Sequence, residues 1–201
     1  MARAPRIEIP GGIYHLGSRG NRGCQIYMDD HERKVFLRMF GRLSKRHGWQ
    51  LGTYCLMTNH YHLLMTIERG LSDGMRELNG GFSSWTNQKN GLEGHLFKNR
   101  FWYEPIEDEA HYLQAARYIV LNPVRAGICA SPEEWRWSSY RACAGLEFPP
   151  PFLAADELLR CFGKKPATAR ETYREFVSDG IDDALARARP GVRHRDESRT
   201  R

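Results

Sequence analysis

The spacing of hydrophobic and polar residues along the chain predicts alternating strands and helices. Short runs rich in apolar, β-branched and aromatic residues predict strands at 13–16, 49–57 and 61–67, and a hairpin or edge strand within 95–106. Longer segments, in which apolar residues recur every three or four positions, predict helices at 30–47, 71–89 and 108–121. The predicted order is therefore strand, helix, two strands, helix, strand and helix.

This order of elements predicts the fold class. Strand pairs separated by helices can form an antiparallel sheet with helices packed on one face, so we expect an α+β fold of the ferredoxin-like (RRM-like) kind. A chain of 201 residues with 41% hydrophobic residues can bury one good core, with room for a small appendage.

The pattern changes near residue 149. Pro149, Pro150 and Pro151 interrupt it, and short helices are expected beyond them at 154–162, 167–178 and 181–189. Six arginines and few apolar residues follow between 187 and 201, which is typical of a flexible tail that can bind nucleic acid. We therefore expect a main domain at 1–148, a helical extension at 149–189 and a basic tail at 190–201.

Two histidines flank Tyr61, the first residue of the predicted strand at 61–67. Residues i and i+2 of a strand point to the same face, so His60 and His62 are expected side by side, while Tyr61 turns to the opposite face and packs. Two neutral imidazoles on a rigid strand can share one metal ion, but they need a third nitrogen or oxygen from elsewhere. The alternative is that both histidines are polar residues on a solvated face.

A second candidate group lies on the predicted helix at 108–121, which has acids at its start and is expected to stop at Asn122-Pro123. Tyr118 and Asn122 are four residues apart, so they share one face of the last turn. If that turn faces His60 and His62, the site holds two imidazoles, an amide oxygen and a tyrosine hydroxyl able to act as a nucleophile beside a metal ion. Without these partners, Tyr118 would be read as a core tyrosine.

The net charge of +6 favours a polyanionic partner, with nucleic acid as the leading candidate. Glycines and arginines share the loop after the first strand, and basic residues lie among aromatic ones at 95–106, which suits phosphate binding and base stacking. The candidate DNA-binding residues are Arg19, Asn21, Arg22, Lys98, Arg100, Trp102, Arg125, Arg193 and Arg195. A DNA groove could also be lined by Ser83, Ser84, Trp85, Asn87 and Lys89. In each place the alternative is ordinary surface charge or core packing.

Other features of the sequence exclude several classes of protein. The five cysteines are odd in number, scattered and without a CxxC pair, which argues against a disulfide framework and a thiolate zinc site. No segment is apolar for long enough to be a signal peptide or a membrane span. We therefore expect a soluble cytoplasmic protein with no membrane partner, associated with the nucleoid if it binds DNA.

Five segments occur together in a characteristic order: YHLGSRGNRG (14–23), TYCLMTNHYHLLM (53–65), GHLFKNRF (94–101), RYIVLNPVRAGI (117–128) and EWRWSSYRA (134–142). In this order they resemble the transposases associated with repetitive extragenic palindromes, the REP-associated tyrosine transposases. These are relatives of the single-tyrosine HUH transposases of bacterial insertion sequences. The pair of histidines is a weak signal by itself, whereas the ordered set is a strong one. Thr58 stands where relatives often have proline, which changes the turn before the histidines but removes no ligand.

The resemblance implies a ferredoxin-like catalytic domain at 1–148 and a DNA strand-transfer reaction. Tyr118 would attack a phosphodiester and leave a 5′-phosphotyrosine and a free 3′-hydroxyl, beside Mg²⁺ or Mn²⁺ held by His60, His62 and Asn122. Tyr112, earlier on the same helix, is the reserve nucleophile. The substrate would be a single-stranded hairpin, a repetitive extragenic palindrome (REP), with a guide tetranucleotide bound near the loop at 19–23. The protein would act as a monomer or a homodimer.

Two other functions stay open at this point. An HUH nickase of the replication-initiator or relaxase kind would form the same adduct but recognise an origin. A non-catalytic protein on the same fold would bind the hairpin without cleaving it.

Overall fold

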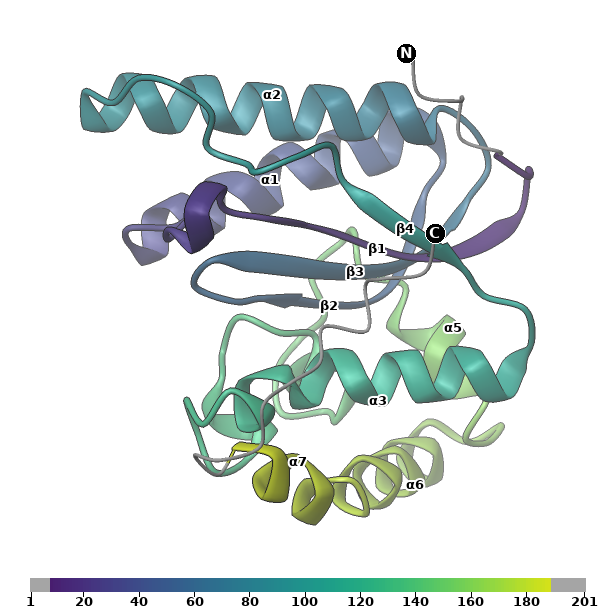
Figure 1. Ribbon diagram of the computed structural model, residues 1–201. Coiled ribbons are helices and arrows are strands. Elements are labelled where there is room, and N and C mark those ends of the chain that lie inside the picture. The colour runs from purple at the N-terminus through teal and green to yellow at the C-terminus, as the bar shows by residue number, and fades with distance from the viewer. Residues whose placement is uncertain (1–7, 189–201) are drawn as a thin grey trace.

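A four-stranded antiparallel sheet forms the centre of the computed structural model, which describes residues 8–188 (Figure 1). Its strands are β1 (Gly12–Arg19), β2 (Gln50–Leu56), β3 (His60–Ile67) and β4 (Trp102–Pro105). Their order across the sheet is β2-β3-β1-β4, which makes β4 the edge strand that the sequence predicted. This order and the alternation with helices confirm the ferredoxin-like α+β fold.

Helices cover both faces of the sheet (Figure 1). The helices are α1 (Asp30–His47), α2 (Leu71–Asn90), α3 (Glu109–Arg125), α4 (Tyr140–Cys143), α5 (Ala155–Arg160), α6 (Pro166–Ser178) and α7 (Ile181–Ala188), with short turns η1 (Asn21–Gly23) and η2 (Pro132–Glu134). α1 and α2 lie on one face, and α3 lies on the other with α6 and α7 beyond it.

The sequence placed the helices on one face, which holds for α1 and α2, whereas α3 covers the second face; β3 shows why both faces are covered. Tyr61 points to the first face, and the centroid of its ring lies 4.8 Å from that of the Phe36 ring in α1. The next residue, His62, points to the other face, and the centroid of its ring lies 5.7 Å from that of the Tyr118 ring in α3. Because both faces of β3 are buried, each needs its own layer of helices.

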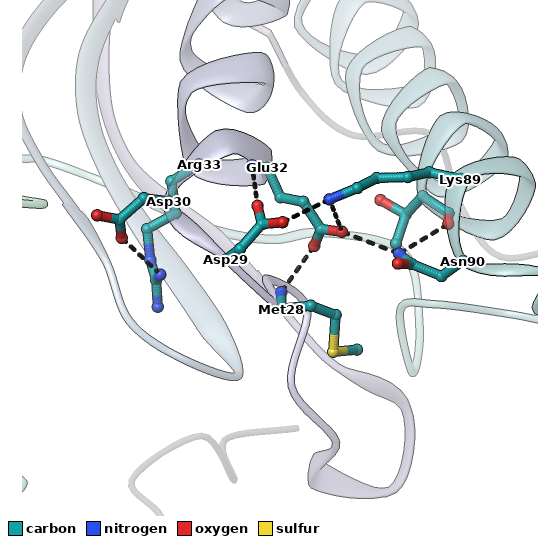
Figure 2. A network of polar contacts seen from close by, with 8 residues as sticks. Met28, Asp29, Asp30, Glu32, Arg33, Lys89 and Asn90 are labelled. Atoms are coloured by element: carbon teal, nitrogen blue, oxygen red, sulfur yellow. Dashed lines mark hydrogen bonds and ion pairs between the residues drawn. The ribbon is translucent and has the colours of Figure 1, made fainter.

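The two helices of the first face are joined by a polar network (Figure 2). The carboxylate of Glu32 is fully buried, and it accepts hydrogen bonds from the backbone N of Met28 at 2.7 Å, Nζ of Lys89 at 3.0 Å and Nδ2 of Asn90 at 2.9 Å. Lys89 also reaches Asp29, the N-cap of α1, at 2.6 Å. A buried carboxylate is tolerated only when it is paired in this way, so the network ties the start of α1 to the end of α2.

Two boundaries differ from the prediction more than the others do. β1 continues past residue 16 to Arg19, which places the first arginine of the glycine-rich loop inside the sheet. α3 continues through Pro123 to Arg125, one turn beyond the predicted stop. Proline removes one backbone donor, but the backbone N of Ala126 still donates to the carbonyl of Asn122 at 2.9 Å, and the helix ends before Gly127, whose φ is +67°.

The segment after α3 closes the outer edge of β2. The backbone N of Leu56 donates to the carbonyl of Trp137 at 2.8 Å, and the Trp135 indole donates to the carbonyl of Leu56 at 3.1 Å. The backbone N of Ala154 donates to the carbonyl of Leu51 farther along the same strand. The described part of the predicted extension thus contacts the sheet, and its α6 and α7 pack on α3. The division at residue 148 stays a prediction.

All five cysteines are free thiols. Among residues 8–188, no helix combines the length and the apolar character that crossing a membrane requires.

Candidate active site

The sheet face that packs against α3 has a position without a side chain at its centre. Gly17 of β1 pairs with His62 of β3 on one side and with Trp102 of β4 on the other. A Cβ atom at Gly17 would lie 3.0 Å from the Trp102 indole. The glycine therefore lets this ring lie across β1, and its centroid is 5.6 Å from that of His62.

His60 and His62 stand side by side at the start of β3, with ring centroids 5.0 Å apart. Each Nδ1 atom already has a hydrogen-bonding partner. Nδ1 of His60 lies 2.7 Å from Oδ1 of Asn59, and Nδ1 of His62 lies 3.0 Å from Nε2 of His15. Because a carboxamide oxygen only accepts hydrogen bonds, Nδ1 of His60 carries a proton, and its Nε2 keeps a lone pair when the ring is neutral.

Burial keeps both imidazoles neutral. The pKa of His60 is lowered to about 4, chiefly by burial and then by the charge of Arg19, while a hydrogen bond with the Asn122 side chain acts in the opposite direction. Burial also lowers the pKa of His62 well below its usual value, and the neighbouring His15 and His60 add to this effect. Both rings are therefore neutral at pH 7, the form that can bind a metal ion.

Tyr118 and Asn122 reach the same place from α3. The Tyr118 ring lies 5.7 Å from that of His62 and remains 38% exposed, so a substrate can reach it. The guanidinium of Arg125 lies 4.9 Å from the centroid of the Tyr118 ring. Asn122 is nearly buried, and its Nδ2 donates to the Tyr118 carbonyl at 3.1 Å, which leaves Oδ1 for another partner. The structure thus brings together four residues that come from β3 and α3.

The donors of this site suit a divalent metal ion. His60 and His62 offer neutral imidazole nitrogens, and Asn122 offers an amide oxygen, which would leave other coordination positions for water or phosphate oxygens. Within residues 8–188, no group of three or more His, Cys, Asp or Glu side chains could hold a metal ion. The third donor would therefore have to be a group of another kind, such as the Asn122 amide.

The glycine-rich loop after β1 lies next to the histidines. Arg19 pairs with His60 in the sheet, and Nδ2 of Asn59 donates to the carbonyl of Gly23 in the loop at 3.1 Å. Arg22 adopts a left-handed conformation, with φ of 53°, and its side chain is exposed. The positive charges of this loop are therefore held at the end of the sheet that carries His60.

The segment before β4 runs beside the same loop. The backbone N of Asn21 donates to the carbonyl of Leu96 at 2.8 Å, and the backbone N of Lys98 donates to the carbonyl of Arg19 at 2.9 Å. Three residues of this segment were predicted to bind DNA, and all three are exposed: Lys98, Arg100 and Trp102. Both predicted DNA-binding segments thus meet at one end of the sheet, whereas Arg193 and Arg195 lie outside the described residues.

Other candidates lie apart from this site. The Tyr112 hydroxyl lies against Gly52 of β2, and burial raises the pKa of this phenol well above its usual value. On α2, Lys89 is bound by the carboxylates of Asp29 and Glu32 (Figure 2). The ring of Trp85, also on α2, stacks on Phe82.

Two residues of the site were not among the candidates from sequence. His15 and Asn59 each bond to one of the paired histidines, His15 across the sheet and Asn59 through the adjacent turn. Both lie in segments that carry the family resemblance. Alternation along β1 could have placed His15 on the face of Gly17, but its partner depends on the register of β1 and β3.

Comparisons with a family model and with known proteins agree with one another, because each finds transposases. A family model described as "Transposase IS200 like" matches residues 13–122, a range that contains His60, His62, Tyr118 and Asn122. The REP-associated tyrosine transposase of Escherichia coli (strain K12) is 22% identical over 144 residues, which cover 70% of this chain and 83% of that protein. A relative in Haemophilus influenzae is 22% identical over 168 residues, covering 75% of this chain and 92% of the relative.

A solved structure has the same fold. It is that of a REP-associated tyrosine transposase bound to a REP hairpin, and it matches with a TM-score of 0.61 and 21% sequence identity. The match covers 77% of this chain and 92% of that one.

Proposed function

Because this chain belongs to the family of IS200-like transposases, enzymes that cut and rejoin DNA, we propose that it is a REP-associated tyrosine transposase with Tyr118 as its nucleophile. Its substrate would be a single-stranded REP hairpin, as the relatives and the hairpin-bound structural neighbour suggest. The observation that carries the proposal is the meeting of the exposed Tyr118 phenol with the buried His62 imidazole, 5.7 Å apart between ring centroids.

In the proposed reaction, the Tyr118 oxygen attacks a backbone phosphorus in line with the leaving oxygen. A bond forms between the tyrosine oxygen and phosphorus, and the bond from phosphorus to the 3′-oxygen breaks. The phenol loses its proton and the leaving oxygen gains one, which yields a 5′-phosphotyrosine and a free 3′-hydroxyl. A second 3′-hydroxyl can reverse the step and join strands without ATP, because the phosphotyrosyl bond keeps the energy of the broken link.

We assign the metal-binding role to His60, His62 and Asn122, with Mg²⁺ or Mn²⁺ as the ion. When bound, the ion would neutralise charge on the non-bridging oxygens of the phosphate. The chain contributes two imidazoles kept neutral by burial and an amide oxygen next to the nucleophile. Arg125 adds a positive charge beside the Tyr118 ring, where negative charge develops as the proton leaves.

The DNA would approach the end of the sheet where the loop at 19–23 meets the segment at 95–102. Arg19, Arg22, Lys98 and Arg100 would neutralise phosphates, and Asn21 would add a polar contact. The Trp102 indole, 39% exposed, offers a surface on which an unpaired base can stack. We infer that the guide tetranucleotide binds at this loop, while binding by Arg193 and Arg195 is inferred from composition alone.

Covalent capture tests this function. Labelled single-stranded DNA that carries the host's palindromes is incubated with the protein and Mn²⁺ or Mg²⁺, with a chelator control, and resolved by denaturing electrophoresis. We expect a labelled band of protein size for the wild type and none for Tyr118→Phe, which should bind the hairpin as tightly as the wild type. An adduct that persists in Tyr118→Phe would contradict the assignment of the nucleophile. Failure of the wild type on every palindrome would favour a protein that only binds DNA.

A further inference from the structure

A third histidine completes the polar part of the candidate active site. His15 lies on β1, is 7% exposed, and bonds through Nε2 to Nδ1 of His62 at 3.0 Å. Its ring also contacts Trp102 edge to face, with centroids 4.7 Å apart, and lies 6.0 Å from the Tyr118 ring. His15 therefore touches the proposed metal ligand and both exposed aromatic residues of the site.

The hydrogen bond between the two rings can be made in two directions, and the direction matters. If His15 donates, the neutral His62 ring carries its proton on Nε2 and has no free lone pair for a metal ion. If His62 donates from Nδ1, its Nε2 keeps a lone pair that can bind the ion. Only the arrangement in which His15 accepts is compatible with metal binding by His62.

His60, the other proposed metal ligand, also has its Nδ1 atom held by a neighbouring side chain. Nδ1 of His60 is held by Oδ1 of Asn59, which can only accept. Both histidines thus have Nδ1 engaged by a residue outside the pair, which leaves Nε2 as the common metal-facing atom. Ligating histidines commonly donate their other ring N–H to such a partner, which fixes the tautomer and the orientation of the ring.

We propose that His15 is a positioning residue for metal binding: it accepts the Nδ1–H of His62 and holds that ring with the Nε2 lone pair available to the ion. This inference rests on the proposed function, because it assumes that His62 is a ligand. It adds a residue from β1 to a proposed metal site whose ligands come from β3 and α3.

Two substitutions separate the hydrogen bond from the packing. His15→Phe keeps a planar ring beside Trp102 but offers no acceptor. His15→Gln keeps an oxygen that can accept from His62. His47→Phe is the matched control, because this histidine stacks on Trp49, at a ring distance of 5.1 Å, from α1 on the opposite face.

The test is Mn²⁺ binding to the full-length protein without DNA, measured by electron paramagnetic resonance of the free ion. We expect His15→Phe to weaken Mn²⁺ binding by about 10- to 100-fold, His15→Gln to retain most of the affinity, and His47→Phe to leave it unchanged. Thermal unfolding and hairpin binding in chelator check that the variants are folded. In the wild type, long-range ¹H–¹⁵N spectra should place the His62 proton on Nδ1.

The outcomes distinguish this inference from the function on which it rests. Unchanged Mn²⁺ affinity in His15→Phe, together with loss of binding in His62→Ala, would overturn the role of His15 and leave the metal site standing. A wild-type His62 protonated on Nε2 would also overturn that role, without any variant. Equal Mn²⁺ binding by the wild type and His62→Ala would overturn both the metal site and the inference.

Discussion

At the scale of single residues, the Asn59 carboxamide connects two parts of the proposed function. Its Oδ1 accepts from His60, and its Nδ2 donates to the Gly23 carbonyl in the glycine-rich loop at 3.1 Å. One side chain therefore holds a proposed metal ligand and a proposed DNA-binding loop in a fixed relation. The two hydrogen bonds use opposite ends of the amide, so substitutions can remove them separately.

Replacing Asn59 should separate metal binding from DNA binding. Asn59→Asp keeps an acceptor for His60 but loses the donor to Gly23, so we expect Mn²⁺ affinity at or above the wild-type level and weaker hairpin binding. Asn59→Ala loses both bonds and should weaken both, each by about two- to tenfold, the effect of a hydrogen bond worth about 1 kcal/mol. Mn²⁺ titration and fluorescence anisotropy of a labelled hairpin measure the two effects. Equal losses of Mn²⁺ affinity in both variants would contradict the separation.

The residues of the site differ in how far sequence could predict them. His60 with His62, and Tyr118 with Asn122, share a face through the repeat of a strand and of a helix, so spacing alone brings each pair together. That β3 and α3 then meet depends on packing, which spacing does not encode. His15 and Asn59 depend on cross-strand register and on the closure of a turn, and these emerge only from the whole sheet.

At the scale of elements, α1 and α2 form a layer that takes no part in the proposed chemistry. Their ends are joined by the Glu32 network, and their inner faces cover the sheet opposite the histidines (Figures 1 and 2). Patterning predicted both helices well, because an apolar stripe is a local feature of the sequence. The network was not predicted, because it joins residues far apart in the chain.

Disrupting this network should lower stability and leave the chemistry intact. Glu32→Ala leaves the Met28 backbone N without its buried acceptor and removes one of the two acceptors of the Asn90 amide, so we expect the free energy of unfolding to fall by about 1–3 kcal/mol. The control is Glu77→Ala, which removes an exposed partner of Arg46 and should cost less than about 1 kcal/mol. Urea unfolding measures both. A large loss of DNA cleavage by folded Glu32→Ala protein would contradict the separation of the two faces.

At the scale of the whole molecule, the positive charge proposed to bind DNA gathers at one end of the sheet. Arg19 and Arg22 belong to the loop after β1, and Lys98 and Arg100 to the segment that runs beside it. Binding driven by such charges releases counterions, so affinity should fall as salt rises. Arg76, the arginine of α2, lies on the layer that covers the other face and should not contribute.

Salt dependence tests this distribution of charge. Arg22→Ala and Lys98→Ala should each weaken hairpin binding and reduce the slope of log affinity against log salt by about 0.7, the value for one single-strand phosphate contact. Arg76→Ala is the control, because this arginine is exposed on α2 beside Asp73. Anisotropy titrations at several salt concentrations give the slopes. A change in slope for Arg76→Ala as large as that for Arg22→Ala would show that charge acts without regard to position.

The way the sheet ends on each side has a consequence for crowded solutions. Unpaired strand edges can template pairing between copies and start aggregation. Here the backbone of β2 is capped by Trp137 and Ala154, and β4 is short and ends at Pro105, which has no N–H to donate. Both edges of the sheet therefore resist pairing with a strand from another molecule, which should keep concentrated protein from forming fibrils.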